Sequence, residues 1–180
     1  TFSKASEIST TAIGNLALAN AEFATALGSS AQATGLQSLA LGTLSSAEND
    51  SAIAIGTAAK SIGLSASAIG HGAVATGTQT IAFGTLSNAV GDSSLALGTT
   101  AHAAGVGANA IGLSATALGS QSIALGSLAK AEAEFSTVIG SSANASGEGA
   151  SAIGYLANAK GEQSIALGSL SAASEKGAIA

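Results

Sequence analysis

Glycine occupies every fourteenth position of this 180-residue chain. The twelve multiples of fourteen are Gly14, Gly28, Gly42, Gly56, Gly70, Gly84, Gly98, Gly112, Gly126, Gly140, Gly154 and Gly168. A fixed period of this length indicates one small structural unit that is repeated along the chain, as in solenoid proteins. We therefore expect an extended surface rather than a catalytic pocket, with these glycines at the turns.

The positions of the unit, numbered as columns 1 to 14 with the glycine at column 14, differ sharply in character. Columns 3 and 5 hold only Ala or Ser, column 10 holds only Ala, Ser or Thr, and column 12 is Ala except at Val138. Column 13 is always large and apolar: Ile13, Leu27, Leu41, Ile55, Ile69, Phe83, Leu97, Ile111, Leu125, Ile139, Ile153 and Leu167. Small and large residues thus alternate, which is the pattern of a strand.

This alternation predicts an all-β fold, a parallel β-roll solenoid with two short strands per 14-residue coil and about 13 coils. The small columns 3, 5, 10 and 12 should face one another across a thin interior. Glycine is frequent in column 7 as well as constant in column 14, so we expect turns with positive φ at both columns. Where Ala21, Ala133 or Glu175 replaces the column-7 glycine, or Phe23 or Phe135 fills column 9, we expect local bulges.

Charge is confined to one side of each unit. The five lysines and ten acidic residues all lie in columns 4, 6, 7 or 8. Columns 9 to 14 and 1 to 3 carry none, as expected of a buried face, since an unpaired charge is costly to bury. The formal net charge of −5 argues against nucleic acid as a partner, because nucleic-acid binding requires a basic surface.

Column 13 should face outward and form an apolar stripe that a soluble monomer rarely leaves bare. Column 11 extends this stripe, and its largest members include Ile53, Ile81, Leu95, Ile123 and Ile165. We expect columns 13 and 11 to form an interface between identical chains, arranged as a small parallel bundle with closed symmetry. The pattern alone leaves a dimer and a trimer open.

Some column-11 residues within this predicted interface are polar: Thr11, Thr25, Ser67, Asn109, Thr137 and Ser151. Asn109 is the most polar of them. One interpretation is that it controls the register between chains, as a buried Asn does in coiled coils. The other, which we favour, is a gap in which water bridges the polar groups.

No catalytic, cofactor-binding or metal-binding residue is predicted, and the chain has no cysteine to act as a nucleophile. His71 and His102 are isolated in sequence and are interpreted as surface residues. Acidic residues recur in column 8, as at Asp92 and Glu148, and carboxylates suit calcium. The repeat of known calcium ladders is missing, so a solvated rim is the preferred interpretation.

The recurring segments Ser-Ile-Ala-Leu-Gly-Ser at 122–127 and 164–169, and Ser-Leu-Ala-Leu-Gly-Thr at 94–99, carry a resemblance. Together with the Ala-x-Ala segments that follow them, they resemble the head repeats of YadA-like trimeric autotransporter adhesins. The resemblance implies a left-handed β-roll, a homotrimer, and adhesion to host cell-surface or extracellular-matrix proteins. It also implies a place on the bacterial outer membrane, held there by an anchor outside this segment.

We interpret residues 1–180 as a single repeat domain, a head fragment that continues beyond both ends in its parent protein. The expected function is that of a non-catalytic surface adhesin whose variable columns 4, 6 and 8 and adjacent turns bind ligand. An ice-binding or other structural solenoid is the alternative, although Thr43, Thr57, Thr85 and Thr99 form a broken threonine array. An acyltransferase of the hexapeptide type is least favoured, because its period is six.

Overall fold

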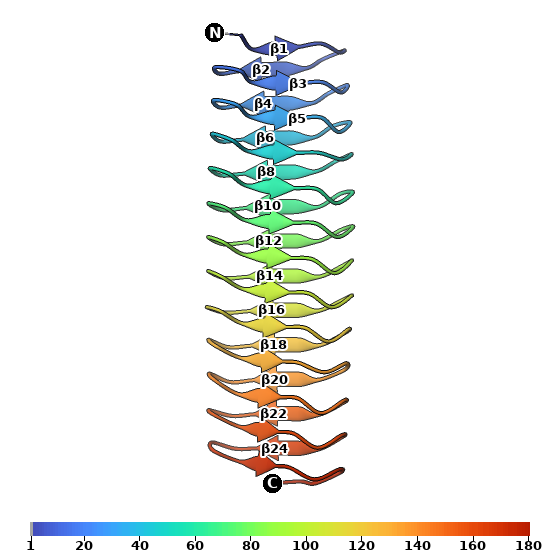
Figure 1. Cartoon of the computed structure of the whole chain (residues 1–180), viewed down its shortest axis with the longest axis vertical. Coiled ribbons are helices and arrows are strands. Elements are labelled where there is room, and N and C mark those ends of the chain that lie inside the picture. The colour runs from blue at the N-terminus through green and yellow to red at the C-terminus, as the bar shows by residue number, and fades with distance from the viewer. Residues whose placement is uncertain (1) are drawn as a thin grey trace. The chain divides into compact units, whose positions relative to one another are not determined.

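The computed structural model describes residues 2–180, and it contains strands and turns without helices in that range. The chain divides into two compact units, Thr1–Ala89 and Val90–Ala180. In each unit, strands of two residues alternate along the chain with strands of three residues (Figure 1). No helix of the described residues has the length and apolar character that a membrane crossing requires.

In the first unit, the two-residue strands form one sheet and the three-residue strands another. The odd sheet contains β1 (Lys4–Ala5), β3 (Leu18–Ala19), β5 (Gln32–Ala33), β7 (Ser46–Ala47), β9 (Lys60–Ser61), β11 (Val74–Ala75) and β13 (Asn88–Ala89). The even sheet contains β2 (Thr11–Ile13), β4 (Thr25–Leu27), β6 (Leu39–Leu41), β8 (Ile53–Ile55), β10 (Ser67–Ile69) and β12 (Ile81–Phe83).

The second unit repeats this arrangement. Its even sheet contains β14 (Leu95–Leu97), β16 (Asn109–Ile111), β18 (Ile123–Leu125), β20 (Thr137–Ile139), β22 (Ser151–Ile153) and β24 (Ile165–Leu167). Its odd sheet contains β15 (His102–Ala103), β17 (Thr116–Ala117), β19 (Lys130–Ala131), β21 (Asn144–Ala145), β23 (Asn158–Ala159) and β25 (Ala172–Ala173).

The strands within each unit pair in parallel, and each pairing joins residues fourteen positions apart. Leu18 of β3 pairs with Gln32 of β5, and Ala26 of β4 pairs with Ala40 of β6. Each column of the sequence therefore becomes a row of stacked residues, and each unit is a parallel β-solenoid with 14 residues per coil. This confirms the fold predicted from the repeat, with two strands in each coil.

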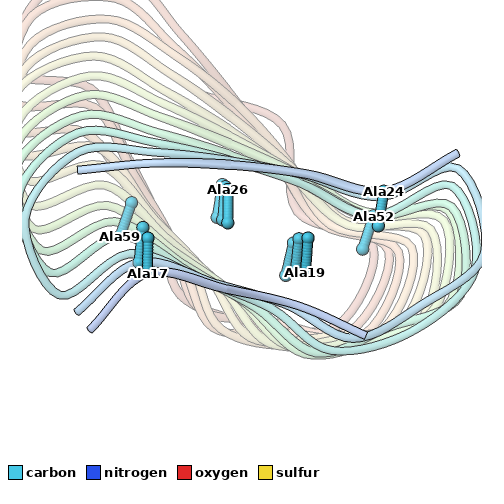
Figure 2. Packing of buried hydrophobic residues seen from close by; sticks show 11 residues of the cluster. Ala17, Ala19, Ala24, Ala26, Ala52 and Ala59 are labelled. Atoms are coloured by element: carbon cyan, nitrogen blue, oxygen red, sulfur yellow. The ribbon is translucent and has the colours of Figure 1, made fainter. Parts of the chain in front are cut away.

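The interior is filled by the small columns, as predicted. Figure 2 shows Ala17 and Ala19 of one wall facing Ala24 and Ala26 of the other, each stacked on its equivalents in neighbouring coils. These alanines have essentially no exposed surface. Because the two sheets are separated only by methyl groups and hydroxyls, Val138 is the largest fully buried side chain among the described residues.

The turns differ from the prediction at column 7. Left-handed conformations occur at columns 2, 9 and 14, with φ from +126° to +144° at the column-14 glycines and from +52° to +68° at columns 2 and 9. Most residues in columns 2 and 9 are not glycine, and they include Leu16, Gln37 and Phe135. Column 7 has no positive φ, so the expectation of a left-handed glycine there is wrong.

Glycine is favoured in column 7 because the backbones of successive coils approach closely. A Cβ built on Gly105 or Gly119 would overlap the carbonyl group of column 7 in the next coil. Ala133 nevertheless occupies this column, and the expected bulges do not form. Phe23 and Phe135 have the same φ as other column-9 residues, and their amides donate to the carbonyls of Ile8 and Ser120 at 3.0 Å.

Candidate assembly and binding surfaces

Each coil presents two outward surfaces of opposite chemistry. We call the outward columns 11 and 13 of the even sheet the even face, and the outward columns 4 and 6 of the odd sheet the odd face. The inward neighbours of these residues, columns 12 and 5, are buried except in the terminal coils. The structure thus places every predicted interface residue on the even face of its unit.

The even face is uncharged and rich in exposed aliphatic surface. Leu27, Leu97 and Leu125 are each about two-fifths exposed, at 39%, 39% and 42%, and Phe83 is 49% exposed. Most column-11 residues are half-buried, because stacked neighbours cover one another along the ladder, but Ile81, Ile123 and Ile165 are exposed. Since part of each side chain is already covered, further burial of a column-13 residue would contribute only about 1 kcal/mol.

The turn beside the even face adds apolar surface that the sequence interpretation missed. Leucine occurs repeatedly in column 2, where a left-handed backbone holds the side chain outward. Leu44 and Leu86, for example, are 61% and 56% exposed with φ of +59° and +56°. A bulky residue in this conformation costs free energy, of the order of 1–3 kcal/mol. Because they are exposed, the column-2 leucines extend the apolar surface at the edge of the even face.

The odd face is mostly polar, with a few exposed aliphatic residues such as Val90 and Leu118, and it carries charges that remain exposed. Lys60 lies 3.4 Å from Glu48, with the Lys60 side chain 49% exposed and that of Glu48 38% exposed. Beside the odd face, Lys176 forms an ion pair with Glu162 of the preceding coil, between the turns of columns 7 to 9 (the 7–9 turns), with distances of 2.9 and 3.0 Å from Nζ to the two carboxylate oxygens. Exposed ion pairs of this kind contribute little to stability.

The odd face of the second unit is hollowed beside β19 and β21. A groove of about 360 Å³ is lined by Leu128, Lys130, Glu132, Ser142, Ala143 and Asn144. It therefore combines a cation, a carboxylate and an amide along one apolar edge. The Oδ1 atom of Asn144 is buried without a hydrogen-bond partner, as is that of Asn158 on the next strand. The sequence assigned no binding role to these asparagines, because the repeat does not show which column-4 atoms are covered by neighbouring coils.

The titratable residues considered from the sequence remain separate in the structure. His71 is exposed on the turn after β10, and His102 is half-buried on β15. Within residues 2–180, no three His, Cys, Asp or Glu side chains gather closely enough to hold a metal ion. Column-8 acids such as Glu134 and Glu148 are exposed at the rim, on the opposite turn from the column-2 leucines.

These features define a class of protein: a parallel β-solenoid with an uncharged sheet on one side and a charged sheet on the other. The YadA head domain repeat model matches at 5–31, 33–59, 61–87, 89–115, 103–129, 117–143, 131–157, 145–171 and 159–180. The chain belongs to this family. YadA heads are adhesins that bacteria expose at the outer membrane, and they are in general not enzymes, so membership supports an adhesin role.

The collagen-binding domain of the Yersinia adhesin YadA is a similar solved structure. It is 24% identical, with a TM-score of 0.45, over 83% of this chain and 68% of that domain. No curated protein matches the chain.

Proposed function

We propose that the chain is the head of a non-catalytic bacterial adhesin that works as a parallel homotrimer. The even faces of three chains bury one another, and the odd faces and 7–9 turns point outward to bind host cell-surface or extracellular-matrix proteins. The head is displayed at the surface of the outer membrane. The chain's formal net charge of −5 does not favour nucleic acid as a partner, and no cofactor enters this role.

The segregation of charge is the observation that carries the proposal. Every charged residue avoids the even face, and large aliphatic side chains occupy that face along both units. A partner for such a surface must itself be uncharged and apolar, and the same face of another copy meets this requirement. Closed symmetry then covers all copies equally and prevents open-ended polymerisation.

The outward surfaces suit binding by many weak contacts. Columns 4, 6 and 8 vary from coil to coil while the backbone repeats, so each unit offers a regular scaffold with changing side chains. Binding by several such chains held together gains from effective concentration, which can raise overall affinity about 10²–10⁴-fold. The polar wall of the groove beside β19 and β21, formed by Lys130, Glu132 and Asn144, is one place on the odd face where such contacts would form.

Binding of the purified segment to immobilised extracellular-matrix proteins, collagen among them, and to host cells tests this function. We expect the native protein to bind at least one of these surfaces. The variant Ile111→Asp, which should separate the chains, should bind at least tenfold more weakly through loss of avidity. Replacing Lys130 and Glu132 of the groove by Ala provides a comparison variant that should remain assembled. Absence of binding to every surface would contradict the adhesive role.

A further inference from the structure

The even face contains a second, longer period of 42 residues, or three coils. Four coils share the pattern Gln-[Ser/Thr]-[Leu/Ile]-Ala-[Leu/Phe]-Gly-[Ser/Thr]-Leu, and they recur at 37–44, 79–86, 121–128 and 163–170. In these apolar coils, columns 11 and 13 are large aliphatic or aromatic residues. Column 2 of the following unit, which ends each segment, is always leucine. The strands concerned are β6 and β12 in the first unit, and β18 and β24 in the second.

A second set of coils recurs with the same period and the opposite character. In these polar coils column 11 is always hydrophilic: Thr25, Ser67, Asn109 and Ser151. They belong to β4 and β10 in the first unit, and to β16 and β22 in the second. The third coil of each period is mixed, with Thr11, Ile53, Leu95, Thr137 and Ile179 in column 11.

Exposure in column 11 follows this three-coil period in three of the four apolar coils. Ile81, Ile123 and Ile165 are 45%, 39% and 38% exposed, while Leu39 of the first apolar coil and the column-11 residues of the polar coils are half-buried. The column-2 leucines that end the apolar coils protrude further, with Leu128 51% and Leu170 69% exposed. Each unit thus projects an apolar layer from its even face every third coil, about 14 Å apart.

We propose that this three-coil period sets the register in which copies of the chain align, an inference that rests on the homotrimer of the proposed function. With the 14-residue repeat alone, a chain displaced by one coil would find the same backbone and the same column-13 residues. The 42-residue period removes this ambiguity. When all copies are level, each apolar layer meets two apolar layers and each polar layer meets two polar layers.

A displacement by one or two coils brings unlike layers together. The isobutyl and sec-butyl groups of an apolar coil then face side chains such as Asn109, whose amide now lacks polar partners. An unpaired polar group in such a contact is unfavourable, so the displaced arrangements are disfavoured. The Asn109 side chain has only a local hydrogen bond among the described residues, from Nδ2 to the carbonyl oxygen of Gly107 at 3.1 Å. Within the part of the chain that the structure describes, the Oδ1 atom of Asn109 accepts no hydrogen bond and is available to a neighbouring copy.

The inference predicts an unusual dependence on length. Residues 99–112, 99–126 and 99–140 comprise one, two and three whole coils of the second unit. A chain lacking three coils keeps its layers level with those of the native chain, because the period is restored beyond the deletion. A chain lacking one or two coils has unlike layers beyond the deletion, although it has lost less surface.

The test is to refold the native chain together with each shortened chain and to count mixed trimers by native mass spectrometry. With the three-coil deletion, mixed trimers should approach the random share of about three-quarters. With the one-coil and two-coil deletions, that share should be at least threefold lower. Each shortened chain must also form its own homotrimer, which shows that the deletion has not prevented folding.

A composition-matched variant gives an independent measurement. Exchanging one polar and one apolar residue, as Asn109→Ile with Ile123→Asn, moves a polar layer by one coil without changing the content of the face. This variant should form its own homotrimer but should mix with the native chain at least threefold less than a tagged native chain does.

Two results would overturn the inference, and they are distinguishable. If the native chain is trimeric but mixed trimers decline steadily with deletion length, or the exchange variant mixes freely, the register proposal is wrong and the trimer stands. If the native chain is monomeric under these conditions, the proposed assembly itself fails and the register proposal falls with it.

Discussion

The two outward faces of each coil enclose the same interior, but they differ in charge and in exposed apolar surface. The odd face, on strands of two residues, carries lysines and glutamates that stay hydrated, as at Lys60 and Glu48. The even face, on strands of three residues, carries none of the fifteen charges and exposes large side chains such as Phe83. The difference shows that the small interior decides the fold of each coil, while the outward residues decide what each face contacts.

The largest effect on assembly and stability is expected when a charge is placed on the even face. Ile111→Asp on β16 should dissociate the assembly and destabilise it by about 3–5 kcal/mol per chain, because an uncompensated carboxylate would be buried. Thr116→Asp on the odd strand β17 is the matched control and should leave the particle mass unchanged. Native mass spectrometry and thermal melting of both variants measure the effect. Equal behaviour of the two variants would contradict the assignment of the faces.

A change to the shared interior should affect both faces. Ala68 on β10 is fully buried between Ala54 and Ala82 of neighbouring coils. Ala68→Leu should cost about 1–3 kcal/mol or more, because the two sheets leave room only for small groups. Ala66→Ser is the control, since serine is common in column 10. Circular dichroism should show a lower melting temperature for the Ala68→Leu variant but not for the Ala66→Ser control. An unchanged melting temperature for Ala68→Leu would mean that the interior has room for large side chains.

The turns between the faces allow a finer comparison. Gly42→Ala should destabilise by about 1–3 kcal/mol, since φ is +135° and a Cβ would lie 2.5 Å from the carbonyl oxygen of Gly56. Gly72→Ala should cost less than about 1 kcal/mol. Its φ of +62° is shared by other residues of column 2, and its Cβ would meet only the end of Leu86. Urea unfolding compares the two variants, and similar losses would show that column 14 is not specially constrained.

The smallest change is expected at the charged rim. Glu148→Ala in column 8 should alter the free energy of unfolding by less than about 0.5 kcal/mol and should leave the particle mass as it is. The side chain is exposed on a 7–9 turn, away from the even face. A marked loss of stability or assembly, measured in the same unfolding and mass experiments, would show that this rim takes part in the structure.

Much of this architecture could be predicted because the same pattern of residues recurs in every coil. Twelve glycines at a spacing of fourteen, with alanine alternating against large residues, specify the parallel pairing and the narrow interior. The restriction of charge to four columns separates the two faces. The resemblance of 122–127 and 164–169 to YadA head repeats predicted the family that the chain belongs to.

The parts that could not be predicted depend on backbone geometry rather than on composition. Column 7 is rich in glycine because coils approach closely there, whereas left-handed residues fall at columns 2 and 9, where Leu and Gln give no such signal. The exposure of Leu44 and the orphaned Oδ1 of Asn144 also required coordinates. Which outward side chains bind a ligand stays a prediction, since each variable position occurs only once.

The mass of the particle in solution tests the central claim most directly, namely that the even face is covered by other copies of the chain. Native mass spectrometry or light scattering at micromolar concentration should give a particle of about 50 kDa, three times the 16.7 kDa of one chain. A stable, well-folded species of 16.7 kDa, with column-13 side chains open to solvent, would contradict the account.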